Sequence, residues 1–312
     1  MLEVGLIASR FLHYATVMVL FGVALFPLYT YASRVGDPPA RLQHWLHRVL
    51  PIAGLLALLS GLAWGYFTVA NMAGSLSSAA DPDTLRSVLH ETTFGKVWVA
   101  RLSLLVALLV LLRSSYARIW HPDRTTPLVS AVLLASLAGV GHTQLHEGVM
   151  RCVHAGSDAA HLLAAGAWLG GLIVLGYLLA LARPAPVAEA TADASTALAR
   201  FSSIGYIAVA ALIASGLINS WFSVGSIGAL VTNAYGQLLV VKLCLFAAML
   251  ALAGLNRYWL VPLMVSEKAS GQPAASLQRL RRHVLSEQVL GLLIVLVVSL
   301  LGTMQPAIAS AQ

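Results

Sequence analysis

The hydrophobic residues of this chain are gathered into eight long blocks separated by short polar connections. An apolar stretch of about 20 residues is long enough to cross the hydrocarbon core of a bilayer as a helix. None of the connections between blocks is long enough to form a soluble domain. We therefore predict eight transmembrane helices, with the approximate ranges 6–31, 49–72, 96–112, 127–146, 154–181, 201–222, 237–264 and 283–304.

The composition excludes the soluble alternatives. Of the 312 residues, 59% are hydrophobic and 10% are charged, and the mean hydropathy is +0.82. Soluble domains average about 25% charged residues, and disordered chains have few apolar ones. Two cysteines, Cys152 and Cys244, are too few for a disulfide framework. The sequence therefore predicts an all-α, polytopic membrane helix bundle.

The lysines and arginines are distributed unevenly between the two sets of connections. Connections that follow the first, third, fifth and seventh blocks hold 13 of the 19 Lys and Arg residues. Because cytoplasmic loops of membrane proteins are enriched in Lys and Arg, we predict that these connections are cytoplasmic and that both termini lie outside. The net charge of +7 is then a consequence of topology, and nucleic-acid binding is not needed to explain it.

The two halves of the chain resemble each other. His13 precedes Gly22 by nine residues, and His161 precedes Gly170 by the same step. We infer a duplication of four plus four helices, with residues 1–153 and 154–312 as the two repeats. Since each repeat has an even number of helices, the two have the same topology and are related by an axis along the membrane normal. Further matched pairs are Ser60-Gly61-Leu62 with Ser215-Gly216-Leu217, Phe94-Gly95 and Arg101 with Tyr235-Gly236 and Lys242, and Gly141 with Gly302.

Three histidines are predicted at a similar depth in the outer leaflet. His13, His142 and His161 lie about five to eight residues from the outer ends of their helices, which is roughly 8–12 Å at 1.5 Å per residue. Ionisable groups at such depth usually face the interior of a bundle and are functional candidates. Interhelical hydrogen bonding is the alternative role for the three side chains.

Other potential ligands share helical faces with these histidines. His142 and His146 are four residues apart, and His154, Asp158 and His161 follow at steps of four and three. Imidazoles with a carboxylate are suitable ligands for copper or zinc, and Asp158 can equally fix the tautomer of a ligating histidine. We predict His146, His154 and Asp158 as an outer access face to the three buried histidines.

Charged residues within the predicted helices leave a second interpretation open. Arg10, Arg101 and Lys242 lie in the outer leaflet, where their positive charge suits an anionic ligand such as the propionates of haem. A b-type haem would use two histidines as axial ligands, for example His13 and His161. The sequence has no nucleotide-binding, hydrolase or metalloprotease motif, and we do not expect an enzyme.

Several motifs in this order are similar to those of the bacterial copper-resistance protein D family (CopD/PcoD). The resemblance implies a multi-pass protein of the inner membrane that moves copper inward. It also implies copper as the bound ion, a role in copper homeostasis and a periplasmic copper-binding partner of the CopC type. The motifs are Arg10-Phe-Leu-His13-Tyr14, Thr93-Phe94-Gly95-Lys-Val-Trp98-Val-Ala-Arg101, Gly141-His142, His161 with Trp168-Leu-Gly-Gly171, and Tyr235-Gly236-Gln-Leu-Leu-Val-Val-Lys242.

Overall fold

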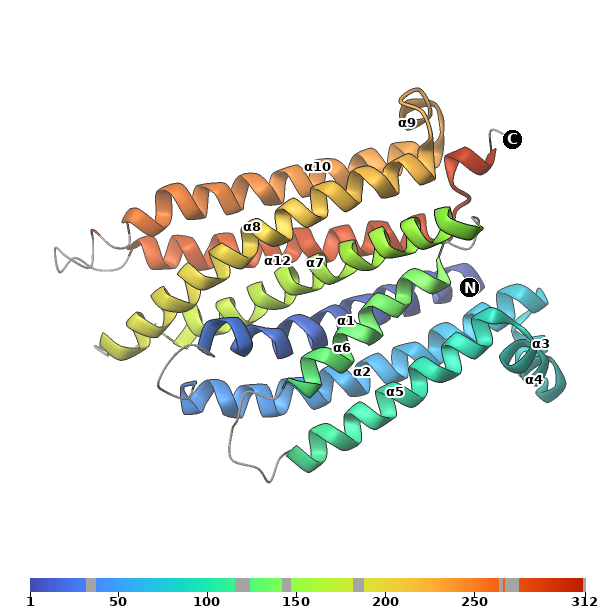
Figure 1. Cartoon of the computed structure of the whole chain (residues 1–312), viewed down its shortest axis with the longest axis horizontal. Helices are drawn as coiled ribbons and strands as arrows, with labels where there is room; N and C mark the ends of the chain where they lie inside the picture. Colours follow the sequence, from blue (N-terminus) through green and yellow to red (C-terminus); the bar gives the residue numbers. More distant parts are fainter. Residues whose placement is uncertain are drawn as a thin grey trace.

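The computed structural model describes residues 1–31, 38–115, 124–141, 147–181, 188–263, 266 and 275–310. In this part of the chain the regular structure is helical (Figure 1), which confirms the predicted all-α bundle. A helix satisfies its backbone hydrogen bonds within its own segment, as the bilayer core requires. The long helices are α1 (Leu2–Tyr31), α2 (Ala40–Ala73), α5 (Thr93–Ser115), α7 (Gly148–Leu181), α8 (Ala188–Val224), α10 (Ala234–Leu255) and α12 (Ala275–Leu301).

Shorter elements connect the long helices or extend them. They are α3 (Leu76–Ala79), α4 (Pro82–Glu91), α6 (Thr125–Ala135), α9 (Ala229–Thr232), the 3₁₀ helices η1 (Ser136–Val140) and η4 (Ala307–Ser310), and the π-helical turn η3 (Asn256–Leu260) that continues α10. Helix α4 has a clear sequence signal for its start, because the Asp81 side chain accepts from the Thr84 backbone N–H and Pro82 occupies the first turn.

Seven of the predicted spans correspond to helices that are long and apolar enough to cross a membrane. The predicted fourth span, 127–146, differs because its apolar helix is shorter and covers Thr125–Val140. Its α-helical part ends at Ala135 and continues as the 3₁₀ turn η1. Gly139 and Gly141 lie at this end, and glycine lowers helix stability by about 1 kcal/mol relative to alanine.

Helices α1 and α7 form the centre of the bundle. They are the most buried spans, with 67% and 72% of their most apolar stretches inside the protein. Helices α2, α5 and α6 lie on one side of this pair, and α8, α10 and α12 lie on the other (Figure 1). Each first helix of a predicted repeat is therefore central, and the remaining helices of that repeat pack around it.

The ends of the bundle are consistent with two repeats of the same topology. Both chain termini lie at one end, together with α3, α4 and α9 (Figure 1). At that end the first turn of α5 packs closely on α4 through Gly95 and Leu89, and α10 packs on α9 in the same way through Gly236 and Leu230. The predicted boundary between residues 153 and 154 falls within the first two turns of α7, and this division of the chain stays a prediction.

Candidate functional site

His13 is buried inside the first half and uses both ring nitrogens. Its Nδ1 lies 2.9 Å from the Ala57 carbonyl oxygen, and its Nε2 lies 2.9 Å from Nη2 of Arg101. Arginine has only donors, so Nε2 of His13 accepts from Arg101 and Nδ1 donates to Ala57. The imidazole is therefore neutral and held in one tautomer, between α2 and α5.

Arg101 closes this first cluster from the side of α5. Its side chain is 3% exposed, and Nη1 donates to the Leu133 carbonyl at 2.6 Å and to the Ser136 hydroxyl. The rings of Trp64 and Trp98 each lie 5.5 Å from the His13 ring. The first cluster is therefore enclosed by aromatic side chains, and its guanidinium joins α1, α5 and α6.

His161 occupies the matching position in the second half. Its Nδ1 lies 2.9 Å from Oγ of Ser215, just as Nδ1 of His13 lies 3.4 Å from Oγ of Ser60. Leu212 precedes Ser215 by three residues on α8, as Ala57 precedes Ser60 on α2. In each half, the Ser-Gly pair of the second long helix therefore lies against the equivalent histidine.

The two histidines differ at Nε2. Lys242 takes the place of Arg101 and interacts with His161 only through its charge. Among the described residues none forms a hydrogen bond with Nε2 of His161. This nitrogen keeps its lone pair because Nδ1 carries the proton, which is the state in which a histidine ligates a metal.

Asp158 lies one turn before His161 in a polar cluster of the second half. Its Oδ1 accepts from Nδ2 of Asn219 at 3.3 Å. Lys242 and Arg10 lie close enough for their positive charges to act on the carboxylate. Nη1 of Arg10 also donates to the Gly302 carbonyl at 2.6 Å, which ties α1 to the end of α12.

His154 lies one helical turn before Asp158 on α7. Its ring is buried and stacks on Phe222, with the ring centroids 4.6 Å apart and the planes at 13°. His142 and His146 lie outside the described residues. In the part of the chain that is described, no three His, Cys, Asp or Glu side chains are grouped so that they would hold a metal ion.

The haem interpretation gains no support from this geometry. Nε2 of His13, the atom that would ligate iron, accepts a hydrogen bond from Arg101. His13 and His161 are each held by the second helix of their own half through Ala57 and Ser215.

The sequence could reveal the Ser-Gly pairs through the repeat. It could not reveal the Arg101 contact or Asn219, because neither has a local pattern that marks it.

Comparisons with known proteins agree with the predicted resemblance. Residues 1–152 match the N-terminal domain of copper resistance protein D-like proteins, and residues 195–301 match copper resistance protein D. No solved structure matches the chain.

Curated relatives match over most of this chain. Copper resistance protein D of Pseudomonas syringae pv. tomato is 31% identical over 311 residues, which is 96% of each chain. Inner membrane protein YebZ of Escherichia coli K12 is 31% identical over 98% of this chain and 100% of its own length. Copper transport protein CutJ of Bacillus subtilis is 31% identical over 82% of this chain, which corresponds to 46% of that protein. With these matches and its bundle of apolar helices, the chain belongs to the copper resistance protein D family of multi-pass inner-membrane proteins.

Proposed function

We propose that this protein binds copper at a histidine site on the periplasmic side of the membrane and moves it into or across the bilayer. Membership of the family supports a role in copper homeostasis. The observation that carries the finer proposal is the state of His161. Ser215 holds its Nδ1, and Nε2 stays available with the Asp158 carboxylate one helical turn away.

The proposed ligands come from the second half and from the segment that precedes it. His161 supplies Nε2, and His142 and His146 supply further imidazoles as the sequence predicts. The described residues on either side of that segment are Gly141 and Glu147, and η1, which ends just before it, packs against α7. His154 and Asp158 remain the proposed outer access face.

His13 has a different place in this proposal from the one that the sequence suggests. A metal on its Nε2 would have to displace the Arg101 guanidinium, which donates a hydrogen bond to that nitrogen. We therefore assign His13 to holding α1, α2 and α5 together, while His161 in the equivalent position binds copper. The duplicated histidine would then have one structural copy and one functional copy.

We further propose that copper arrives on a periplasmic carrier of the CopC type and that both termini are periplasmic. The resemblance to the family supports the carrier, and the distribution of Lys and Arg supports the orientation. The end of the bundle that holds both termini also holds Asp158 and Asn219, which lie near the outer ends of α7 and α8.

Copper binding by the purified full-length chain tests the site. His161→Ala should lower copper affinity by about 10–100-fold or more, which is the usual cost of losing a ligand or its partner. His13→Gln and His90→Ala are the matched controls, because His13 binds Arg101 and His90 is exposed on α4. Equal copper loading of His161→Ala and the wild-type protein, at equal monodispersity, would contradict the proposal.

A further inference from the structure

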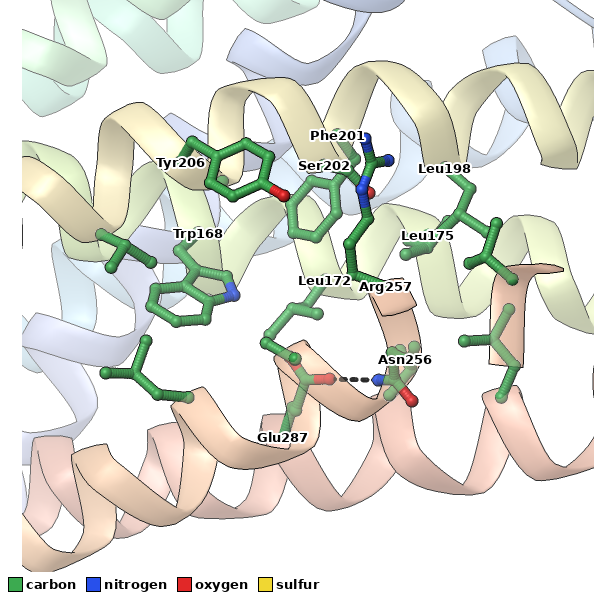
Figure 2. A pocket seen from close by; sticks show the side chains of 18 of the residues that line it. Trp168, Leu172, Leu175, Leu198, Phe201, Ser202, Tyr206, Asn256, Arg257 and Glu287 are labelled. Atoms are coloured by element: carbon green, nitrogen blue, oxygen red, sulfur yellow. Dashed lines mark hydrogen bonds between the residues drawn. The ribbon is translucent and has the colours of Figure 1, made fainter. Parts of the chain in front are cut away.

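A cavity of about 200 Å³ lies in the second half of the protein, between α7, α8, the α10–η3 segment and α12. Apolar and aromatic side chains form most of its wall, including Trp168, Phe201 and Tyr206 (Figure 2). Two polar side chains, Asn256 and Glu287, lie at one side and face each other (Figure 2). The cavity is therefore an apolar chamber with one ionisable carboxyl group in its wall.

Glu287 is one of the most deeply buried ionisable side chains among the described residues, with an exposed fraction of 2%. Its position early in the last apolar block suggests from sequence alone a pairing with a cytoplasmic arginine, and the structure shows a different partner. Nδ2 of Asn256 donates to Oε1 of Glu287 at 2.5 Å, and Trp168 lines the cavity together with the carboxyl group. Burying a carboxylate without a paired cation is costly, so this group requires a bound cation or a proton.

A chain of hydrogen bonds connects this carboxyl group with His283, which lies one turn earlier on α12. Nδ1 of His283 lies 2.8 Å from Oδ1 of Asn256, whose Nδ2 then donates to Glu287. The amide oxygen and the imidazole Nδ1 are both used within the chain, so they are not free to coordinate a metal ion. A proton is therefore the better candidate for the ion at Glu287 than copper.

The backbone at Asn256 differs from that of an ordinary helix. Residues Asn256–Leu260 form a π-helical turn, and such turns often occur at functional sites. The turn places Asn256 in the cavity wall, next to Arg257 and Tyr258 of the same turn. Arg257 lies over the Tyr206 ring, with its Cζ 5.8 Å from the ring centroid.

The charged and titratable groups around the cavity come from three sides. Helix α8 contributes Tyr206, η3 contributes Arg257 and Tyr258, and α12 carries His283 one turn from Glu287. From α7, Trp168 contributes a neutral indole. Arg257 is thus the charged group that shares the cavity wall with Glu287.

The first half lacks this acid. With Gly141 aligned on Gly302, the first half has Thr126 at the position of Glu287. The Ser130 hydroxyl bonds there to the Thr126 carbonyl oxygen, within the helix itself. The acid, like the open Nε2 of His161, is therefore a property of the second half alone.

Helix α7 links the carboxyl group to the proposed copper site. Trp168, which lines the cavity with Glu287, follows His161 by seven residues and so lies on the same face of α7. Two helical turns separate them along the axis, or about 10 Å. A change at His161 can therefore reach the carboxyl group through one rigid element.

We propose that Glu287 exchanges a proton with water at the end of the bundle that carries His283, and that copper movement is coupled to this exchange. The proton passes between a Glu287 carboxyl oxygen and water that enters the cavity, and no bond to copper is formed or broken at this position. This inference rests on the proposed copper function. The inference identifies the proton as the ion whose movement drives or compensates copper movement.

Two measurements on the full-length protein test the inference. In proteoliposomes with an internal pH dye, an added copper gradient should move protons in the wild-type protein. Glu287→Gln should reduce this proton movement at least tenfold and leave copper binding unchanged. Ser286→Ala, an exposed neighbour on the same helix, should behave as the wild-type protein. Copper uptake without proton movement in the wild-type protein would overturn the inference and leave the proposed function intact.

Infrared difference spectra between acid and neutral pH test the carboxyl group without requiring copper uptake. A protonated-carboxyl band should appear in the wild-type protein on acidification and be absent from Glu287→Gln, while His283→Gln should slow its appearance. Identical difference spectra of the wild-type protein and Glu287→Gln would overturn the inference. If the wild-type protein shows the band but takes up no copper, the proposed function fails and the coupling fails with it.

Discussion

Gly22 and Gly170 are in contact where α1 crosses α7. A side chain on either glycine would overlap with the other. A Cβ on Gly170 would be 2.5 Å from Cα of Gly22, and a Cβ on Gly22 would be 2.7 Å from Cα of Gly170. The two residues are equivalent in the predicted repeat, since each follows its histidine by nine positions. Contact between equivalent residues is expected on a two-fold axis, so the predicted repeat would have its pseudo-two-fold axis at this crossing.

The glycine contact makes a prediction about stability. Gly170→Ala should lower the free energy of unfolding by about 1–3 kcal/mol, because the new methyl group meets backbone that cannot move aside. The midpoint of thermal unfolding in detergent measures the effect. Gly156→Ala is the control on the same helix, since no atom lies within 4 Å of its Cβ position. It should leave the midpoint unchanged or raise it. A similar loss for both variants would argue against a tight crossing.

A second prediction concerns the enclosed cluster of the first half. Arg101→Lys should destabilise the protein, because one ammonium group cannot reach His13, the Leu133 carbonyl and Ser136 together. Each buried acceptor left without a donor costs about 1–3 kcal/mol. Thermal unfolding reports this loss, and copper affinity should stay within about twofold.

Arg113→Ala is the control for that cluster, because Arg113 is exposed at the other end of α5. Its unfolding midpoint should match that of the wild-type protein. A loss of copper affinity in Arg101→Lys with no loss of stability would instead place the first cluster in the copper site.

The third prediction separates the hydrogen bond behind His161 from the ligand itself. Ser215→Ala removes the hydroxyl that lies 2.9 Å from Nδ1, but it leaves the imidazole with its Nε2 in place. Copper affinity should therefore fall by less than in His161→Ala. Asp158→Asn should also give an intermediate loss, since the amide keeps the shape but not the charge.

Titration of the purified variants with copper and a competing chelator ranks these affinities. Ser60→Ala provides the matched control, because Ser60 makes the same contact with His13 in the first half. Ser60→Ala should leave copper affinity unchanged. If it lowers affinity as much as Ser215→Ala does, the two halves share the function and the asymmetry proposed for them is absent.

The fourth prediction concerns topology. Helix α12 begins at Ala275 at one end of the bundle and ends at Leu301 at the opposite end, where η4 follows (Figure 1). Reporter fusions at residues 275 and 312 should therefore lie on opposite sides of the membrane, with 275 in the cytoplasm because Arg281 and Arg282 follow it. The reverse assignment would overturn the orientation, and the same side for both would contradict the fold.

The sequence by itself determined the membrane class, the place of each apolar helix along the chain and the spacings that the two halves share, while the short length of the fourth helix emerged only from the structure. These are properties of single residues and of local spacing, because transfer of a helix into lipid depends on its own side chains and backbone. The shared Ser-Gly pairs and the glycines nine residues after each histidine were visible for the same reason, and so was membership of the family.

Only the tertiary structure decided how equivalent residues differ. His13 and His161 have the same spacing in the sequence, yet Arg101 occupies Nε2 of one, while the matching Lys242 makes no hydrogen bond to the other among the described residues. Glu287 is paired with Asn256 of another helix rather than with an arginine. Such contacts join helices far apart in the chain, so they depend on packing angles and side-chain reach that no local pattern contains.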